Sequence, residues 1–152
     1  MDKGIYCLVF ENPGCTLCVG ALGPVAFAPG WHIYVGSALG SGGLKRLARH
    51  IAFSEARDRI PTWHVDYLLT SDFFSLRYAV YAITRKNLEC PLARAVGDPG
   101  VPGFGCSDCH CLSHLFHRHT DPALEVLTAF QGLGLAPVTK TIMSLQCSKG
   151  NI

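Results

Sequence analysis

The sequence predicts a small α/β (α+β) domain, in which a mixed, partly antiparallel sheet is flanked by helices. The chain has 152 residues, about the length of one domain. Apolar residues make up 49% and charged residues 16%, with a mean hydropathy of +0.25, which excludes a disordered or acidic solvating segment. Hydrophobic periodicity along the chain follows the order β-β-β-α-α-β-α, and this mixture of strands and helices indicates the fold class.

Apolar, β-rich runs occupy the first quarter of the chain. Residues 5–10 form an expected strand that ends at the turn signal of residues 12–14. Residues 16–22 are expected to be its hairpin partner, and residues 23–30 a loop bounded by proline and glycine. Residues 32–36 lack polar alternation, so we expect a strand inside the sheet.

The stretch from residue 12 to residue 44 contains no Asp, Glu, Lys or Arg and is long enough to span a bilayer. It also contains eight glycines and three prolines, too many helix breakers for a membrane-spanning helix. The apolar run of residues 4–10 is too short for a signal peptide, and Glu11 interrupts it. We therefore expect no membrane association and a cytoplasmic location, where thiols stay reduced.

Helical periodicity begins at residue 44, after two glycines. One face of this helix carries apolar residues at Leu44, Leu47, Ala48 and Ile51. A second short helix opens at Pro61-Thr62, and residues 73–83 are β-rich again.

Pro91 locates the next helix, because proline is tolerated only in a first helical turn. The helix therefore begins near residues 87–90 and places Glu89 at its N-terminus. Residues 97–105 are expected to form a loop, and a last helix to run from Asp121-Pro122 to about Phe130.

Positive charge is concentrated between residues 45 and 59. Five basic residues against two acidic ones give this segment a charge of +3, while the whole chain has +2. The five basic residues are Lys45, Arg46, Arg49, Arg57 and Arg59. A local basic patch is typical of a protein that binds a phosphate-rich partner, and a solvated helix face is the alternative.

Two strand motifs resemble a known family. Gly4-Ile5-Tyr6 and Tyr34-Val35-Gly36 resemble the paired signatures of the GIY-YIG nuclease superfamily. In that superfamily an arginine, with a histidine one turn later, follows the second motif, and Arg46 and His50 match this spacing. Glu89 matches the family's metal-binding glutamate. We therefore expect a GIY-YIG-like fold.

Three further segments resemble a poorly characterised branch whose members occur alone or fused to endonuclease III-like glycosylases. They are residues 63–69, Glu89-Cys90 and residues 103–109. The resemblance covers roughly residues 4–117, which implies a nuclease domain over residues 1–117 and a C-terminal extension over residues 118–152, for whose role the sequence gives no signal. It also implies a functional link to a DNA glycosylase.

The resemblance implies metal-dependent endonuclease activity on DNA, in repair or processing, with RNA as an open alternative. Tyr6 would act as general base or position the water, and Tyr34 would share or support that role. Arg46 would clamp the phosphate, and His50 would take a proton from a tyrosine or orient it. Glu89 would hold Mg²⁺ or Mn²⁺. The remaining nucleic-acid contacts would come from Lys45, Arg49, Arg57 and Arg59.

Each of these residues also has a structural interpretation. Tyr6 and Tyr34 can be ordinary half-buried strand residues, and Glu89 can simply favour a helix N-terminus. Two further functions therefore stay open: a non-catalytic nucleic-acid-binding module on the same fold, and a zinc-stabilised interaction domain. His64 is expected to make structural hydrogen bonds.

Soft metal ligands cluster in the second half of the chain. Cys106, Cys109, Cys111 and His114 lie within nine residues, and tetrahedral Zn²⁺ takes such ligands. The alternatives are that these side chains line the edge of the active site or fill the core as small apolar groups. A histidine-activated nucleophile at Cys109 or Cys90 is a further alternative, although the sequence shows no oxyanion-binding element.

Overall fold

A five-stranded antiparallel sheet forms the centre of the computed structural model, which describes residues 2–56, 60–106 and 111–142. The strand order is β6-β4-β1-β5-β7. The strands are β1 (Gly4–Asn12), β4 (Gly30–Ala38), β5 (Ser75–Ile83), β6 (Leu115–Arg118) and β7 (Val138–Thr141). The predicted α/β fold class is confirmed, and each paired neighbour in this sheet is antiparallel.

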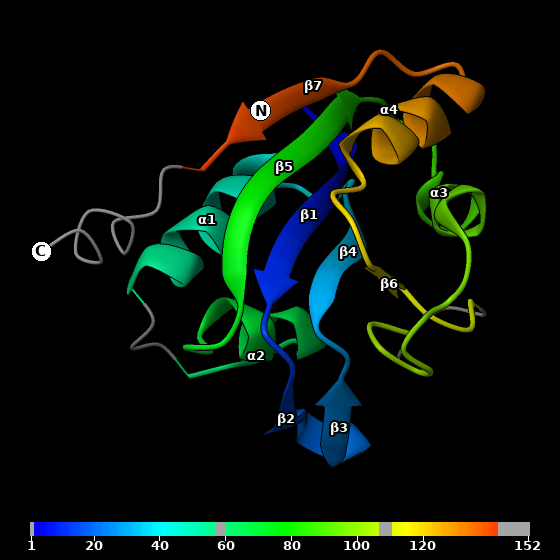
Figure 1. The fold of residues 1–152 in the computed structure, drawn as a ribbon. Coiled ribbons are helices and arrows are strands. Elements are labelled where there is room, and N and C mark those ends of the chain that lie inside the picture. The colour runs from blue at the N-terminus through cyan, green and yellow to red at the C-terminus, as the bar shows by residue number, and fades with distance from the viewer. Residues whose placement is uncertain (1, 57–59, 107–110, 143–152) are drawn as a thin grey trace, which may run out of the picture.

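The α-helices of the described residues cover the two faces of the sheet, as Figure 1 shows. They are α1 (Lys45–Ala56), α2 (His64–Leu69), α3 (Glu89–Val96) and α4 (Ala123–Gly132). α1 and α2 pack in one apolar core, and α3 and α4 pack in the other. The predicted starts of these helices are confirmed to within three residues, including Glu89 as the first residue of α3.

β1 contributes to both cores because successive side chains of a strand point to opposite faces. Tyr6, Leu8 and Phe10 belong to the core on the α1 side. Ile5, Cys7 and Val9 belong to the core on the α3 side. Burial on both faces explains why this strand has a continuous apolar sequence.

The expected hairpin between residues 5–10 and 16–22 is wrong. β2 (Cys15–Cys18) pairs instead with β3 (Pro24–Phe27) in a separate two-stranded sheet, and a short 3-10 helix, η1 (Gly20–Leu22), joins them. The reason is that β4 and β5 occupy both edges of β1. The segment expected to be a loop therefore contains β3, whose Pro24 stands at the first position of the strand, where proline is tolerated.

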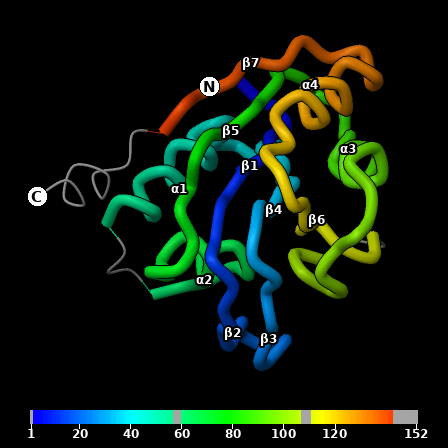
Figure 2. The backbone as a smooth tube through the Cα atoms, in the orientation of Figure 1, coloured from blue at the N-terminus to red at the C-terminus, as the bar shows by residue number. Residues whose placement is uncertain are grey.

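Both edge strands of the main sheet are absent from the sequence-based prediction. Figure 2 shows the chain returning to the sheet at β6, beside β4, and at β7, beside β5. α4 and β7 lie within the expected C-terminal extension, and α4 buries Val126 and Phe130 in the α3-side core. In the described part of the chain, we find no helix with the length and apolar character needed to cross a membrane.

Candidate active site

Four of the five predicted catalytic residues line one cavity of about 250 Å³. We call it the tyrosine cavity. Its predicted members are Tyr6, Tyr34, Arg46 and Glu89, and the other described lining residues are Ser37, Thr62, Trp63, His64 and Gly105. The fifth residue, His50, is buried behind Tyr6 and makes a hydrogen bond to it, with 2.8 Å between His50 Nε2 and Tyr6 Oη.

The register of β1 and β4 brings the two tyrosines together. Tyr6 lies opposite Gly36, and Tyr34 lies opposite Leu8, so the tyrosines are diagonal neighbours on one face of the sheet. A Cβ at Gly36 would lie 2.5 Å from Tyr6 Cζ, so the absence of a side chain makes room for the ring. A Cβ at Gly4 would collide with the carbonyl oxygen of Ala82. Close packing thus explains the glycine in each strand motif.

His50 is held in its neutral form. Its pKa is lowered to about 4, mainly by burial; Asp66 acts in the opposite direction, and Arg49 and Arg46 act in the same direction as burial. Its Nδ1 atom is buried and has no hydrogen-bond partner among the described residues. A proton on Nε2 avoids a buried, unpaired N–H group at Nδ1. In this tautomer His50 donates to Tyr6 Oη and favours negative charge on that oxygen.

Both tyrosines carry their phenolic protons at neutral pH in the free protein. Burial is the main cause and raises the pKa of Tyr6 and of Tyr34 well above the ordinary value. Glu89 raises both pKa values further, whereas Arg46 lowers them. The positive charge of Arg46 thus acts in the direction that a phenolate requires, but burial outweighs it.

Arg46 and Arg49 have different surroundings, although both stack on Trp63, at 4.8 and 4.4 Å from the ring centroid. Arg46 lines the tyrosine cavity and donates from Nη1 to the carbonyl oxygen of Ser37, at 3.0 Å. Arg49 instead forms an ion pair with the buried Asp66, at 3.4 Å. Arg46 is therefore available to a ligand in the cavity, whereas the ion pair of Arg49 connects α1 with α2.

Asp66 has a structural role. Its Oδ2 atom accepts hydrogen bonds from the backbone N–H groups of Thr62 and Trp63, at 2.8 and 2.9 Å. These bonds satisfy N–H groups at the start of α2, as a capping carboxylate does. α2 then holds Trp63 and His64 at the cavity wall.

Glu89 enters the tyrosine cavity from the first turn of α3, although α3 packs against the opposite face of the sheet from Tyr6. Its Oε1 atom lies 3.6 Å from Nδ1 of His114, which is buried. Of the described residues that line the cavity, Glu89 supplies the carboxylate. A carboxylate in a polar cavity is a suitable ligand for Mg²⁺, which takes its other ligands from water and phosphate oxygens.

His64 is a cavity residue that the sequence pattern did not assign to the site. The backbone N–H group of Gly105 donates to His64 Nδ1, at 2.8 Å, which confirms the expected structural hydrogen bonding. Burial lowers its pKa, so the neutral imidazole carries its proton on Nε2 and can donate there. The sequence offers no signal for this role, because the contact with Gly105 spans 41 positions.

The other predicted nucleic-acid-binding residues are partly described. Lys45 lines a second hollow of about 430 Å³, together with Arg46, Arg49 and Trp63, and residues 40–43 complete its described lining. Arg57 and Arg59 lie outside the described residues. The described part of the basic patch therefore adjoins the tyrosine cavity, with Arg46 and Trp63 common to both.

The structure describes three of the four predicted zinc ligands, Cys106, Cys111 and His114. Cys111 and His114 lie with Cys90, and Cys106 is not part of this group. Cys90 and Cys111 form a disulfide. Cys109 lies outside the described residues.

Comparison with models of protein families gives a match. The model of a family described as a domain of unknown function, DUF123, matches residues 5–135. No curated protein and no solved structure matches the chain. The matched range contains all five residues of the predicted catalytic set and extends through α4. This chain is a member of the DUF123 family.

Proposed function

We propose that the protein is a metal-dependent endonuclease that hydrolyses phosphodiester bonds in DNA. The observation that supports this function is the convergence of Tyr6, Tyr34, Arg46 and Glu89 on one cavity from β1, β4, α1 and α3. Hydrolysis of a phosphodiester requires a water aimed at phosphorus, neutralisation of the developing charge and stabilisation of the leaving oxygen. The cavity contains side chains suited to each requirement.

Tyr6 is the residue best placed to activate water. Its Oη atom accepts the hydrogen bond from His50 and interacts electrostatically with the positive charge of Arg46. Both interactions favour the phenolate. Once the phenolic proton has passed to solvent water in the cavity, the Oη atom takes a proton from the attacking water. Tyr34 lies on β4, two positions before Gly36, which is the residue opposite Tyr6. It provides a second hydroxyl to orient the same water.

Arg46 is the phosphate ligand. A planar guanidinium binds two phosphate oxygens at once and stabilises charge that grows in the transition state. Its contact with the Ser37 carbonyl fixes the direction of the guanidinium, and the Trp63 ring supports it. Mg²⁺ or Mn²⁺ held by Glu89, water and phosphate oxygens would supply positive charge at the phosphate and the leaving oxygen.

The test is cleavage of supercoiled plasmid and of branched DNA in Mg²⁺, Mn²⁺ or EDTA, with RNA of matched sequence as a second substrate. We expect wild type to nick DNA only with metal, and Glu89→Gln to lose this activity. Glu11→Gln is the matched control, because it makes the same chemical change at a half-exposed ion pair with Arg77 outside the cavity. Purifying all three proteins identically controls for contaminating nuclease.

The outcomes separate the proposed enzyme from a binding module on the same fold. Salt-dependent DNA binding by both wild type and Glu89→Gln, without cleavage by either, would indicate the non-catalytic module. Equal nicking by wild type and Glu89→Gln would remove Glu89 from the site. Preferential cleavage of RNA would change the assigned substrate.

A further inference from the structure

Three soft metal ligands lie together next to the tyrosine cavity. The Sγ atoms of Cys90 and Cys111 and a ring nitrogen of His114 are all within 4.8 Å of one another. Cys90 stands in the first turn of α3, while Cys111 and His114 precede β6. The group therefore connects two separate segments of the chain. Its two cysteines are 21 positions apart in the sequence.

We propose that Cys90, Cys111 and His114 form a binding site for one Zn²⁺ ion when the two cysteines are reduced. Two thiolates and one imidazole are the ligand types that Zn²⁺ prefers. Ideal Zn–S and Zn–N bonds in a tetrahedron separate sulfur from nitrogen by about 3.6 Å. The distance from Cys90 Sγ to His114 Nε2 is 3.8 Å. These three protein ligands, taken from the described residues, leave one position of the tetrahedron for a further ligand such as water.

The surroundings of His114 provide an independent argument for a metal site. Glu89 Oε1 lies 3.6 Å from Nδ1, on the side of the ring opposite Cys90. A carboxylate there favours the proton on Nδ1 and leaves the Nε2 lone pair toward the sulfur. Metal-binding histidines in proteins characteristically have such a carboxylate beside the nitrogen that does not bind the metal.

The backbone holds His114 in place. Its N–H group donates to the carbonyl oxygen of Phe104, at 2.9 Å, and its own carbonyl oxygen accepts from Val35, at 2.8 Å. The Nε2 atom is thus presented from a fixed segment to the start of α3, so little ordering of that segment is needed when a metal binds.

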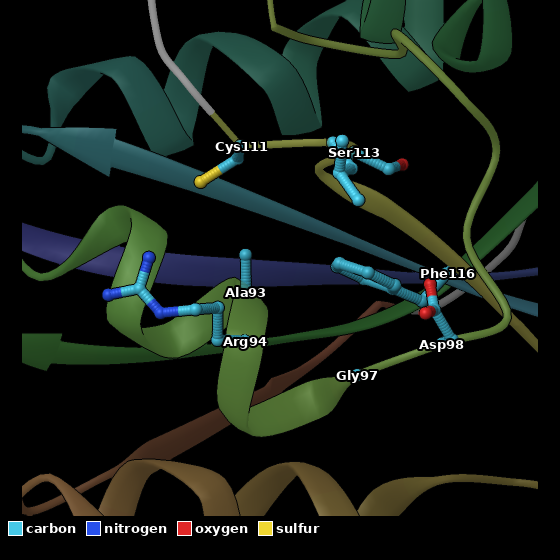
Figure 3. A pocket seen from close by; sticks show the side chains of 8 residues that line it. Ala93, Arg94, Gly97, Asp98, Cys111, Ser113 and Phe116 are labelled. Atoms are coloured by element: carbon cyan, nitrogen blue, oxygen red, sulfur yellow. The ribbon is translucent and has the colours of Figure 1, made fainter.

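One of the three proposed ligands, Cys111, is reached from a pocket. This pocket of about 440 Å³ lies between α3 and the segment of residues 111–116. Figure 3 shows Cys111 at its wall, across from Ala93 and Arg94 of α3. An entry path is one of the features that a metal site in a folded protein requires.

The disulfide and the metal compete for the same two sulfur atoms. A phosphine reduces the disulfide by two electrons and becomes a phosphine oxide, with its oxygen and the two thiol protons supplied by water. Binding of Zn²⁺ by the dithiol then releases two protons and changes no oxidation state. Metal binding therefore requires reduced protein, and the inference does not depend on the proposed nuclease function.

The test is metal titration of the full chain after phosphine treatment and removal of metal. Co²⁺ is the optical probe, because thiolate ligation gives an intense near-ultraviolet charge-transfer band, and Zn²⁺ then displaces it. We expect one equivalent to bind reduced wild type and none to bind protein with the disulfide intact. Cys90→Ser and Cys111→Ser should weaken binding by more than about 100-fold, which is beyond the effect of an outer hydrogen-bond partner. Glu89→Gln should weaken it by about 10–100-fold.

Two controls keep the result interpretable. Cys106→Ser should bind Co²⁺ as wild type does, because Cys106 is outside the group, and circular dichroism checks that each variant is folded. Loss of binding in Cys106→Ser, with retention in Cys90→Ser, would overturn the assigned ligands in favour of the cluster expected from sequence. Failure of folded, reduced wild type to bind one equivalent would overturn the site itself.

Discussion

Tyr6 shows how one residue depends on neighbours that are distant in sequence. His50 lies 44 positions away and contacts its hydroxyl, and Gly36 on the paired strand leaves space for its ring. The chemistry proposed for Tyr6 therefore depends on a buried imidazole and on a missing side chain. Both can be tested separately.

The burial of neutral His50 predicts a loss of stability in acid. Its pKa is about 4 in the folded protein and 6.5 when unperturbed, so below pH 6.5 the unfolded state binds a proton that the folded state does not. The free energy of unfolding therefore has its full value above pH 6.5 with respect to this group. It falls by about 3 kcal/mol through the protonation of His50 as the pH drops toward 4.

Denaturant unfolding at several pH values measures this effect. His50→Gln cannot take up the proton in either state, so its free energy of unfolding should depend less steeply on pH between 6.5 and 4. His119→Gln, at an exposed position, should retain the wild-type dependence. Identical slopes in wild type and His50→Gln would show that another group dominates.

Gly36→Ala tests the close approach of Tyr6. The added methyl group would lie 2.5 Å from Tyr6 Cζ, so the ring or β4 must move, at a cost of about 1–3 kcal/mol. We expect a lower Tm and reduced cleavage. Gly132→Ala is the matched control, since its Cβ meets no atom within 4 Å, and it should be neutral or stabilising by up to about 1 kcal/mol. Equal Tm changes in the two variants would show that the ring moves aside freely.

At the scale of elements, α1 separates two functions along its length. Arg46 lines the tyrosine cavity, while Arg49 pairs with Asp66, which caps α2. Arg46→Ala should lower kcat by about 10²–10³, because the guanidinium acts on charge in the transition state, and should weaken DNA binding much less. Arg49→Ala should instead lower the free energy of unfolding by about 1–3 kcal/mol, because Asp66 loses its charged partner.

Cleavage kinetics, binding at fixed salt concentration and thermal melting distinguish these two results. Equal losses of binding and cleavage in Arg46→Ala would indicate that α1 only binds nucleic acid. A stable Arg49→Ala variant with impaired binding would assign Arg49 to the DNA interface rather than to α2.

Local patterns predicted the helices and the longer strands but not how the strands pair. Pro91 located the start of α3, and the apolar spacing after residue 44 located α1, because both signals act within one or two turns. β6 and β7 have four residues each and are defined by their partners β4 and β5. The hairpin of β2 was assigned to the wrong partner because a turn signal identifies a reversal of the chain but not which strand edge is available.

The same limit applies to the site. The family resemblance implied a shared role for Tyr6 and Tyr34, and the register of β1 and β4 places both tyrosines at one cavity. The grouping of Cys90 with His114 could not be read from spacing, since α3 and the segment before β6 meet only in the folded chain. Proximity in sequence favoured Cys106 instead.

For the whole molecule, the placement of β1 between two apolar layers has a consequence for how the protein can diversify. A shift of this strand by one residue would exchange every side chain between the layers and turn Tyr6 away from the cavity. The distance between the two tyrosines is therefore not a property that small changes in the sheet can adjust. For the proposed enzyme, we expect adaptation to a different substrate in the loop and helix residues that line the tyrosine cavity, around 62–64 and 105, and the adjoining hollow, around 40–43, while the strands stay as they are.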